Sequence, residues 1–274
     1  MKNRTTAIAI GGFDGMHIGH QKLFSQLGKD GTIVVIETGY SNLTPQKERE
    51  NFSDYPIFYF DLDSIRHLDG EGFIKLLKEN FPLLKKIVVG YDFHFGKNRK
   101  YSFDDLIDIF DGEVIIVEEV SLKNDSIHSH KIRTKIQIGD IQGANAFLGH
   151  NYTVRGKQVT GQGIGKKELV ATINLQIENF LIPKEGVYVT LTRIDEEEHL
   201  HPSVSFIGHR FTTDGCFSIE THILDKKIVC QKEASISFVS FIRNNEKFND
   251  LKSLNNAIKQ DITIAHKELQ LLQL

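Results

Sequence analysis

The chain has 274 residues, a length that suits one large domain or two smaller ones. Its hydrophobic content of 40% and charged content of 25% are ordinary for a globular protein. The formal net charge of -3 excludes a protein-wide positive field that would hold DNA or RNA. Cys216 and Cys230 are the two cysteines, too few for a disulfide scaffold in a chain of this length.

The sequence carries no sign of a membrane or secretion segment. The N-terminus lacks the apolar stretch of a signal peptide. No apolar run approaches the ~20 residues that a membrane-crossing helix requires. We therefore expect a cytoplasmic protein whose partners are small molecules, with no nucleic acid and no membrane among them.

The first half of the chain alternates short apolar runs with helical segments. Strands are predicted at 7–11, 32–37, 55–62, 86–90 and 114–117. Helices are predicted at 21–27 and 71–80. This alternation indicates crossover connections and an α/β fold, with a parallel sheet covered by helices on both faces.

The second half has a different texture, with short runs of alternating hydrophobicity between polar or glycine-rich turns. Strands are predicted at 152–159, 186–194, 203–208, 216–224 and 234–242. This pattern predicts an antiparallel barrel or sandwich. Apolar residues at helical spacing over 251–272 predict a closing helix. The domain boundary is expected near 139–150, where glycines punctuate a short helical stretch.

The segment GGFDGMHIGH, residues 11–20, links the first predicted strand to a helix. Gly12 and Gly15 let the backbone approach a phosphate closely, and the helix start favours an anion. His17 and His20 are three residues apart, so both can face one side of the first helical turn. Paired imidazoles there can stabilise charge on a phosphate in the transition state. The structural alternative is that the glycines end a strand and the histidines cap a helix.

A second segment, YDFHFGKNRK, follows the predicted strand 86–90. Its acidic side chain can accept a hydrogen bond from a hydroxyl or ring N–H, its aromatics offer flat surface, and its basic residues suit a phosphate. The alternative is a solvated loop with a core aromatic. The candidate residues are Asp92, Phe93, Phe95, Lys97 and Arg99.

A third segment, HSHKIR, places a hydroxyl and a guanidinium four residues apart at a helix start. Ser129 and Arg133 are the residues concerned. Together such groups can grip a triphosphate. The alternative is a capped surface helix.

Taken in order, these three segments resemble the bacterial family of bifunctional riboflavin kinases/FMN adenylyltransferases, the FAD synthetases. The resemblance continues through GDIQGANAFLGHNYTVRGKQV, IPKEGVYVT and the last third of the chain, so it spans nearly the whole sequence. It implies a Rossmann-like nucleotidyltransferase domain at 1–139. It also implies a small six-stranded antiparallel riboflavin-kinase-like barrel with a C-terminal helix at 140–274.

The resemblance implies ATP as co-substrate, Mg²⁺ as metal, and riboflavin, FMN and FAD as substrates or products. In the first domain it implies that His17 and His20 act on the α-phosphate of ATP. The Asp92 loop would meet the flavin and its phosphate. The other implied contacts to ATP are Gly12, Phe13, Asp14, Gly15, Ser129 and Arg133.

For the second domain the resemblance implies a kinase site. Thr172 and Asn174 match the positions that hold Mg²⁺ and the nucleotide phosphates. Glu220 matches the catalytic glutamate, the general base for attack of the ribityl hydroxyl on the γ-phosphate. From the residues alone, all three also read as polar groups on exposed strand faces.

Several residues depart from the family pattern, which leaves a narrower function open. In the kinase half these departures are Leu169, Ala171, His209-Arg210 and a segment shortened to Lys226-Lys227. The second strand of the first half lacks the usual His-Pro, a place that Glu37 or Tyr40 can fill. The alternative is an FMN adenylyltransferase with a degenerate kinase domain. A nucleotidyltransferase with another acceptor and a non-catalytic flavin or nucleotide sensor are further alternatives.

Overall fold

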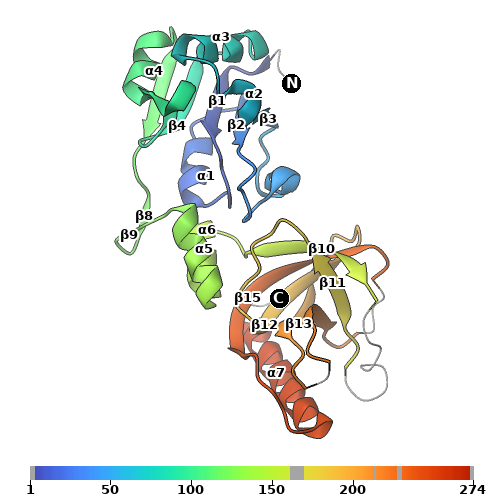
Figure 1. Ribbon diagram of the computed structural model, residues 1–274. Helices are drawn as coiled ribbons and strands as arrows, with labels where there is room; N and C mark the ends of the chain where they lie inside the picture. Colours follow the sequence, from blue (N-terminus) through green and yellow to red (C-terminus); the bar gives the residue numbers. More distant parts are fainter. Residues whose placement is uncertain (1–3, 161–169, 213, 227–229, 272–274) are drawn as a thin grey trace. The chain divides into compact units, whose positions relative to one another are not determined.

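The computed structural model describes residues 4–160, 170–212, 214–226 and 230–271 (Figure 1). It divides into two compact units, Met1–Ser129 and His130–Leu274. Each unit is described by itself. The domain division between residues 139 and 140 stays a prediction.

A parallel sheet with the strand order β3-β2-β1-β4-β7 forms the centre of the first unit (Figure 1). Residue Ala7 of β1 pairs with Gly31 of β2 on one side and with Lys86 of β4 on the other. The order in which strands are added therefore reverses beside β1, and ligands of such sheets bind outside the carboxyl ends at this switch point. The strands are β1 (Ala7–Gly11), β2 (Gly31–Glu37), β3 (Ile57–Asp61), β4 (Lys86–Gly90) and β7 (Glu113–Val117).

Apolar residues on both faces of this sheet are covered, as the sequence predicts. Phe73 and Leu106, from α3 and α4, belong to one buried cluster with Ile10 of β1. Leu23 of α1 belongs to a second cluster with Ala9 of β1. The helices are α1 (Ile18–Phe24), α2 (Leu62–Ile65), α3 (Gly70–Asn80), α4 (Phe103–Ile109), and the 3-10 turns η2 (Gln46–Phe52) and η3 (Lys97–Arg99). Two small hairpins complete the unit: β5 (His94–Phe95) with β6 (Tyr101–Ser102), and β8 (Ser121–Leu122) with β9 (Asp125–Ser126).

The second unit contains a closed antiparallel barrel in the order β10-β11-β14-β13-β12-β15, which confirms the predicted fold class. The strand missing from the predicted runs is β11, which pairs with β10 and β14. The strands are β10 (Thr153–Val159), β11 (Ile173–Ile177), β12 (Gly186–Ile194), β13 (His201–His209), β14 (Phe217–Ile223) and β15 (Glu233–Asn244). The helices are α5 (Ser129–Ile138), α6 (Ile141–Leu148) and α7 (Leu251–Leu271).

Helix α7 is fixed to the barrel by apolar packing and by an ion pair. Ala265 and Leu269 are buried against Val187 of β12. Arg243 of β15 donates to both carboxylate oxygens of Asp261, at 2.9 and 2.8 Å. The Asp261 side chain is only 5% exposed. A buried bidentate pair of this kind fixes orientation, because leaving either charge unpaired is costly.

The barrel also holds a closed ring of buried hydroxyl groups. Each of the five hydroxyls hydrogen-bonds to two others of the set, at 2.8 to 3.0 Å. A closed ring lets every hydroxyl donate once and accept once, so none is left unsatisfied. The ring therefore ties β12, β13 and β14 together in one register. Its members are Thr190, Thr192, Ser203, Ser205 and Thr221.

Candidate active sites

The glycine-rich turn lies at the carboxyl end of β1, where the sheet order reverses. His17 is the N-cap of α1, and its Nδ1 accepts a hydrogen bond from the backbone N–H of His20 at 3.3 Å. His17 therefore does cap the helix, as the structural alternative holds, but it uses only its Nδ1 atom to do so. Because Nδ1 acts as the acceptor, the neutral ring carries its proton on Nε2 and donates from there.

The two imidazoles form a stacked pair. Their ring centroids are 3.5 Å apart with an interplanar angle of 19°. Phe13 meets His20 edge-on, with the centroids 5.1 Å apart. The Nδ1 atom of His20 is buried and has no hydrogen-bond partner among the described residues. A buried polar atom without a partner is unusual in a folded protein. An unpaired nitrogen here is consistent with a site whose bound ligand would supply the missing hydrogen-bond partner.

The environment keeps His20 uncharged. Burial lowers the pKa of His20 well below its usual 6.5, and the neighbouring His17 and Arg49 lower it further. The ring is therefore neutral at pH 7, and a neutral imidazole can act on a phosphate as a hydrogen-bond donor but not as a cation.

This shift predicts that stability falls as the pH falls. Below about pH 6.5 the unfolded chain binds a proton at His20 that the folded chain refuses, so the free energy of unfolding decreases from there down to the lowered pKa. Urea unfolding between pH 7 and pH 5 should show a smaller loss of stability for His20→Gln than for the wild type. Equal losses in the two proteins would contradict the assignment of a suppressed pKa to this ring.

The loop after β2 holds the glycine turn through Asp14. The Asp14 carboxylate accepts the backbone N–H groups of Asn42, Leu43 and Thr44, at 2.9 to 3.2 Å. The N–H of Gly15 donates to the Thr44 hydroxyl at 2.7 Å. With Asp14 only 7% exposed, this carboxylate anchors the backbone of the loop, and its contact with ATP stays a prediction.

Phe13 lies in the core of the first unit, and its contact with ATP stays a prediction. Its side chain is 3% exposed and packs in the core with Phe24. Phe13 and Gly15 have positive φ angles of 48° and 88°, so the turn is tightly wound.

Gly12 is exposed, and a Cβ added there meets nothing within 4 Å. Open space beside this glycine is what the approach of a phosphate requires.

Arg49 is a residue of this site that sequence reasoning missed. Its side chain is fully buried, with Nε donating to the Gly12 carbonyl at 3.1 Å. Its other N–H groups reach the Glu37 carboxylate at 2.9 Å and the Ser41 hydroxyl at 2.7 Å. Glu37 thus serves as the partner of Arg49, whereas Tyr40 is 86% exposed. These partners are distant in sequence, so no local pattern announces the arginine.

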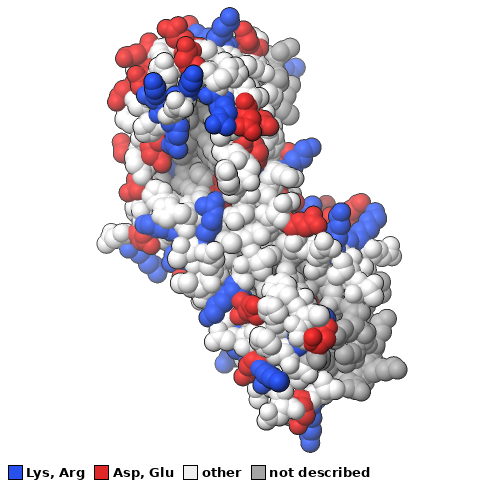
Figure 2. Space-filling model, viewed as in Figure 1, with Lys and Arg blue, Asp and Glu red and all other residues white. Residues whose placement is uncertain are grey.

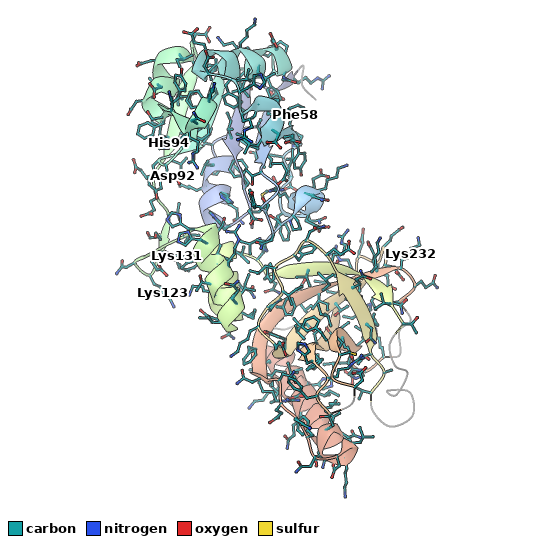
Figure 3. The ribbon with its side chains drawn as sticks, in the orientation of Figure 1. Phe58, Asp92, His94, Lys123, Lys131 and Lys232 are labelled. Atoms are coloured by element: carbon teal, nitrogen blue, oxygen red, sulfur yellow. The ribbon has the colours of Figure 1, made fainter. Side chains whose placement is uncertain are left out.

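The second predicted segment follows β4, beside the glycine turn at the same edge of the sheet. Asp92 and His94 are exposed on this loop (Figure 3). Phe93 is half-buried and stacks on Phe95, with centroids 5.6 Å apart. Phe95 itself is 4% exposed and packs in the core, and its contact with a flavin stays a prediction. The basic residues Lys97 and Arg99 are exposed, as a phosphate contact requires.

Ser129 contacts the glycine turn, and its contact with ATP stays a prediction. Its hydroxyl donates to the backbone carbonyl of Asp14 at 2.8 Å. The preceding residue, His128, pairs through Nε2 with Glu119 at 3.0 Å, and Tyr91 donates to the same oxygen at 2.9 Å. Arg133 belongs to the second unit, and its contact with ATP stays a prediction.

The candidate kinase residues come together in the barrel. Asn174 of β11 lies opposite Glu220 of β14 in the antiparallel register. The hydroxyl of Thr172 donates to Glu220 Oε2 at 3.2 Å. The carbonyl of Ala171 accepts from Nδ1 of His222 at 2.8 Å when that nitrogen is protonated. Leu169 and Lys227 lie outside the described residues.

Basic and acidic side chains are interspersed over the visible faces of both units (Figure 2). This mixture agrees with the small net charge of -3. Within the described part of the chain, no helix combines the length and apolar character needed to cross a bilayer.

Comparisons with known proteins agree with this arrangement. A family model described as riboflavin kinase matches residues 148–269, and one described as FAD synthetase matches residues 1–36. A bifunctional riboflavin kinase/FMN adenylyltransferase of Listeria monocytogenes is 30% identical, with 93% of this chain and 89% of the relative covered. The protein of the same name from Buchnera aphidicola subsp. Acyrthosiphon pisum is 29% identical, with 97% and 94% covered.

A solved structure shares the fold along nearly the whole chain. It is described as a macrolide-efflux protein from Streptococcus pneumoniae and superposes with a TM-score of 0.82 at 24% identity, covering 97% of each chain. At that identity the likeness establishes the fold alone. The near-complete sequence match to the Listeria relative establishes more: the chain belongs to the family of bifunctional riboflavin kinases/FMN adenylyltransferases.

Proposed function

We propose that this chain makes FAD from riboflavin in two ATP-dependent steps, one in each unit. The barrel phosphorylates riboflavin to FMN, and the α/β unit transfers AMP from a second ATP to the FMN phosphate. The transferase activity of the first unit is supported by the stacked His17–His20 pair and by the open space at Gly12, both in the turn that follows β1. The kinase activity of the second unit is supported by the proximity of Thr172, Asn174 and Glu220 in the barrel.

In the adenylyl transfer, an oxygen of the FMN phosphate attacks the α-phosphorus of ATP. The bond to the bridging oxygen breaks, and pyrophosphate leaves. His17 and His20 donate hydrogen bonds to the α-phosphate oxygens as these gain charge, which lowers the barrier without a covalent intermediate. Gly12 leaves space for the α-phosphate of ATP. Lys97 and Arg99 bind the FMN phosphate through their positive charges. Phe93 offers a flat aromatic face on which the flavin ring can stack.

In the kinase step, the ribityl 5′-hydroxyl oxygen attacks the γ-phosphorus and its proton passes to Glu220. The bond between the γ-phosphorus and the bridging oxygen of ADP breaks. The hydroxyl and amide oxygens of Thr172 and Asn174 are the hard ligands that suit Mg²⁺. Mg²⁺ bound there would neutralise charge on the ATP phosphates. The match of residues 148–269 to riboflavin kinase favours this two-step function over an adenylyltransferase with a degenerate barrel.

Chromatographic analysis of products tests both steps. Incubation with riboflavin, ATP and Mg²⁺ should give FMN and then FAD, and incubation with FMN should give FAD and pyrophosphate. If supplied FMN becomes FAD but riboflavin yields no FMN, the function narrows to the adenylyltransferase. If neither product forms, the proposal fails.

A valine at position 12 tests whether ATP occupies the space beside the glycine turn. A Cβ at Gly12 meets no protein atom within 4 Å, so Gly12→Val is expected to fold normally. The added methyl groups would exclude a phosphate, so the KM for ATP in FAD formation should rise by about tenfold or more, a loss of ~1.4 kcal/mol. Gly39→Val is a poor control because Gly39 has a φ of 76°. The kinase rate of the same variant serves instead, and an unchanged KM for ATP would contradict the placement.

A further inference from the structure

Arg210 reaches the candidate general base of the kinase site. It follows β13 and lies across the hairpin from β14. Its Nη1 atom is 3.3 Å from Oε1 of Glu220, and the two side chains are 20% and 19% exposed. A half-buried ion pair in this position contacts the reacting carboxylate directly.

Arg210 is itself held in place by Asp214. Its Nε donates to Oδ1 of Asp214 at 3.1 Å, and its Nη2 donates to Oδ2 at 2.8 Å. Two parallel hydrogen bonds between a guanidinium and a carboxylate fix both orientation and position. The N–H that points to Glu220 therefore comes from a fixed group and not from a mobile arginine.

The opposite oxygen of Glu220 is also held. Thr172 donates to Oε2 at 3.2 Å, so each carboxylate oxygen has a hydrogen-bond partner among the described residues. A glutamate side chain has several rotatable bonds, and restricting them before substrate arrives removes an entropy cost from the reaction. Glu220 is thus oriented from both sides.

We propose that Arg210, braced by Asp214, is a positioning residue that holds the Glu220 carboxylate ready for the riboflavin hydroxyl. Transfer of a phosphoryl group depends almost entirely on positioning and electrostatics, because its transition state is loose. A base oriented by a third group is a recurring arrangement in such sites. Arg210 belongs to the His209-Arg210 pair that departs from the family pattern. The inference rests on the proposed kinase activity.

The test is a steady-state measurement of riboflavin phosphorylation by the full chain. Arg210→Gln should lower kcat by about 10²-fold, the scale of a misplaced reacting group, with the KM values for riboflavin and ATP close to those of the wild type. Arg210→Lys keeps the positive charge but loses the planar guanidinium that makes two parallel hydrogen bonds. Its kcat should therefore lie between those of Arg210→Gln and the wild type. Asp214→Asn, which weakens the brace alone, should give a smaller loss than Arg210→Gln.

Arg155→Gln is the matched control. Arg155 lies on β10 and pairs with Glu233 at 3.7 Å, so this variant also removes a barrel arginine from an ion pair. It should keep the wild-type kcat. Titration with riboflavin checks that each variant barrel still binds substrate, and Arg210→Lys carries the test if Arg210→Gln does not fold.

The outcomes separate the inference from the function on which it rests. An Arg210→Gln protein with the kcat of the wild type, or with a higher kcat, would overturn the positioning role. So would a rise in KM at constant kcat, since that result would assign Arg210 to substrate binding. A wild-type chain that forms no FMN from riboflavin would refute the kinase activity and the inference together.

Discussion

Replacing His20 with alanine should slow FAD formation from FMN by ~10²-fold or more, the scale on which lost electrostatic stabilisation is measured. The neutral ring is stacked 3.5 Å from His17 and carries a buried Nδ1 that has no partner among the described residues. In the proposed mechanism, its loss removes a hydrogen-bond donor to the α-phosphate, and it also leaves His17 without its stacking partner. The measurement is the initial rate of pyrophosphate release with FMN and ATP.

Two controls separate this effect from general damage. His67→Ala removes an exposed histidine of the same unit and should keep the wild-type rate. The riboflavin kinase rate of His20→Ala should be unchanged, because that chemistry belongs to the barrel. Near-normal FAD formation by His20→Ala would remove the histidine pair from the mechanism.

Replacing Glu220 with glutamine should slow riboflavin phosphorylation by ~10²- to 10⁴-fold, the contribution of a positioned general base. Glutamine keeps the size of the side chain and can still hydrogen-bond to Thr172, which lies 3.2 Å from the carboxylate. It cannot take the proton of the ribityl hydroxyl. The expected signature is a lower kcat with riboflavin binding retained.

Glu178→Gln provides the matched comparison, since Glu178 is an exposed acid just after β11. That variant should phosphorylate riboflavin at the wild-type rate, and Glu220→Gln should still convert supplied FMN to FAD. If Glu220→Gln makes FMN as fast as the wild type, another group accepts the proton and the kinase assignment is wrong.

The central strands of the first unit were predictable because they are buried on both faces. Such strands read as continuous apolar runs, and the predicted strands at 7–11 and 86–90 coincide with β1 and β4. The first helix begins earlier than the sequence predicts, because α1 spans Ile18–Phe24 whereas the pattern predicts 21–27. Its N-cap is a histidine, which is not among the usual capping residues.

Side-chain roles were harder to predict than strands. The motif indicates that a carboxylate follows Phe13, but only the fold shows that Asp14 accepts three backbone N–H groups from 42–44. Phe95 is an aromatic residue that could stack on a ligand, but it is buried like a core residue. Local sequence does not distinguish a ligand-contacting side chain from a structural one, because both roles use the same residue type.

Contacts across the barrel depend on register. Thr172 and Glu220 are brought together by the pairing of β11 with β14, in which Ile173 lies opposite Thr221. Strand β11 is short and half polar, so its alternation does not stand out from the flanking polar residues. Arg210 was visible in the sequence as a departure from the family, but its contact with Glu220 follows only from the hairpin that joins β13 to β14.

The most direct test of the transferase mechanism is a crystal structure of the chain with α,β-methylene-ATP, whose α–β linkage resists cleavage. The α-phosphate is expected beside Gly12, within hydrogen-bonding distance of the imidazoles of His17 and His20. A nucleotide bound elsewhere, or an empty glycine turn with both rings closed against the protein, would contradict it.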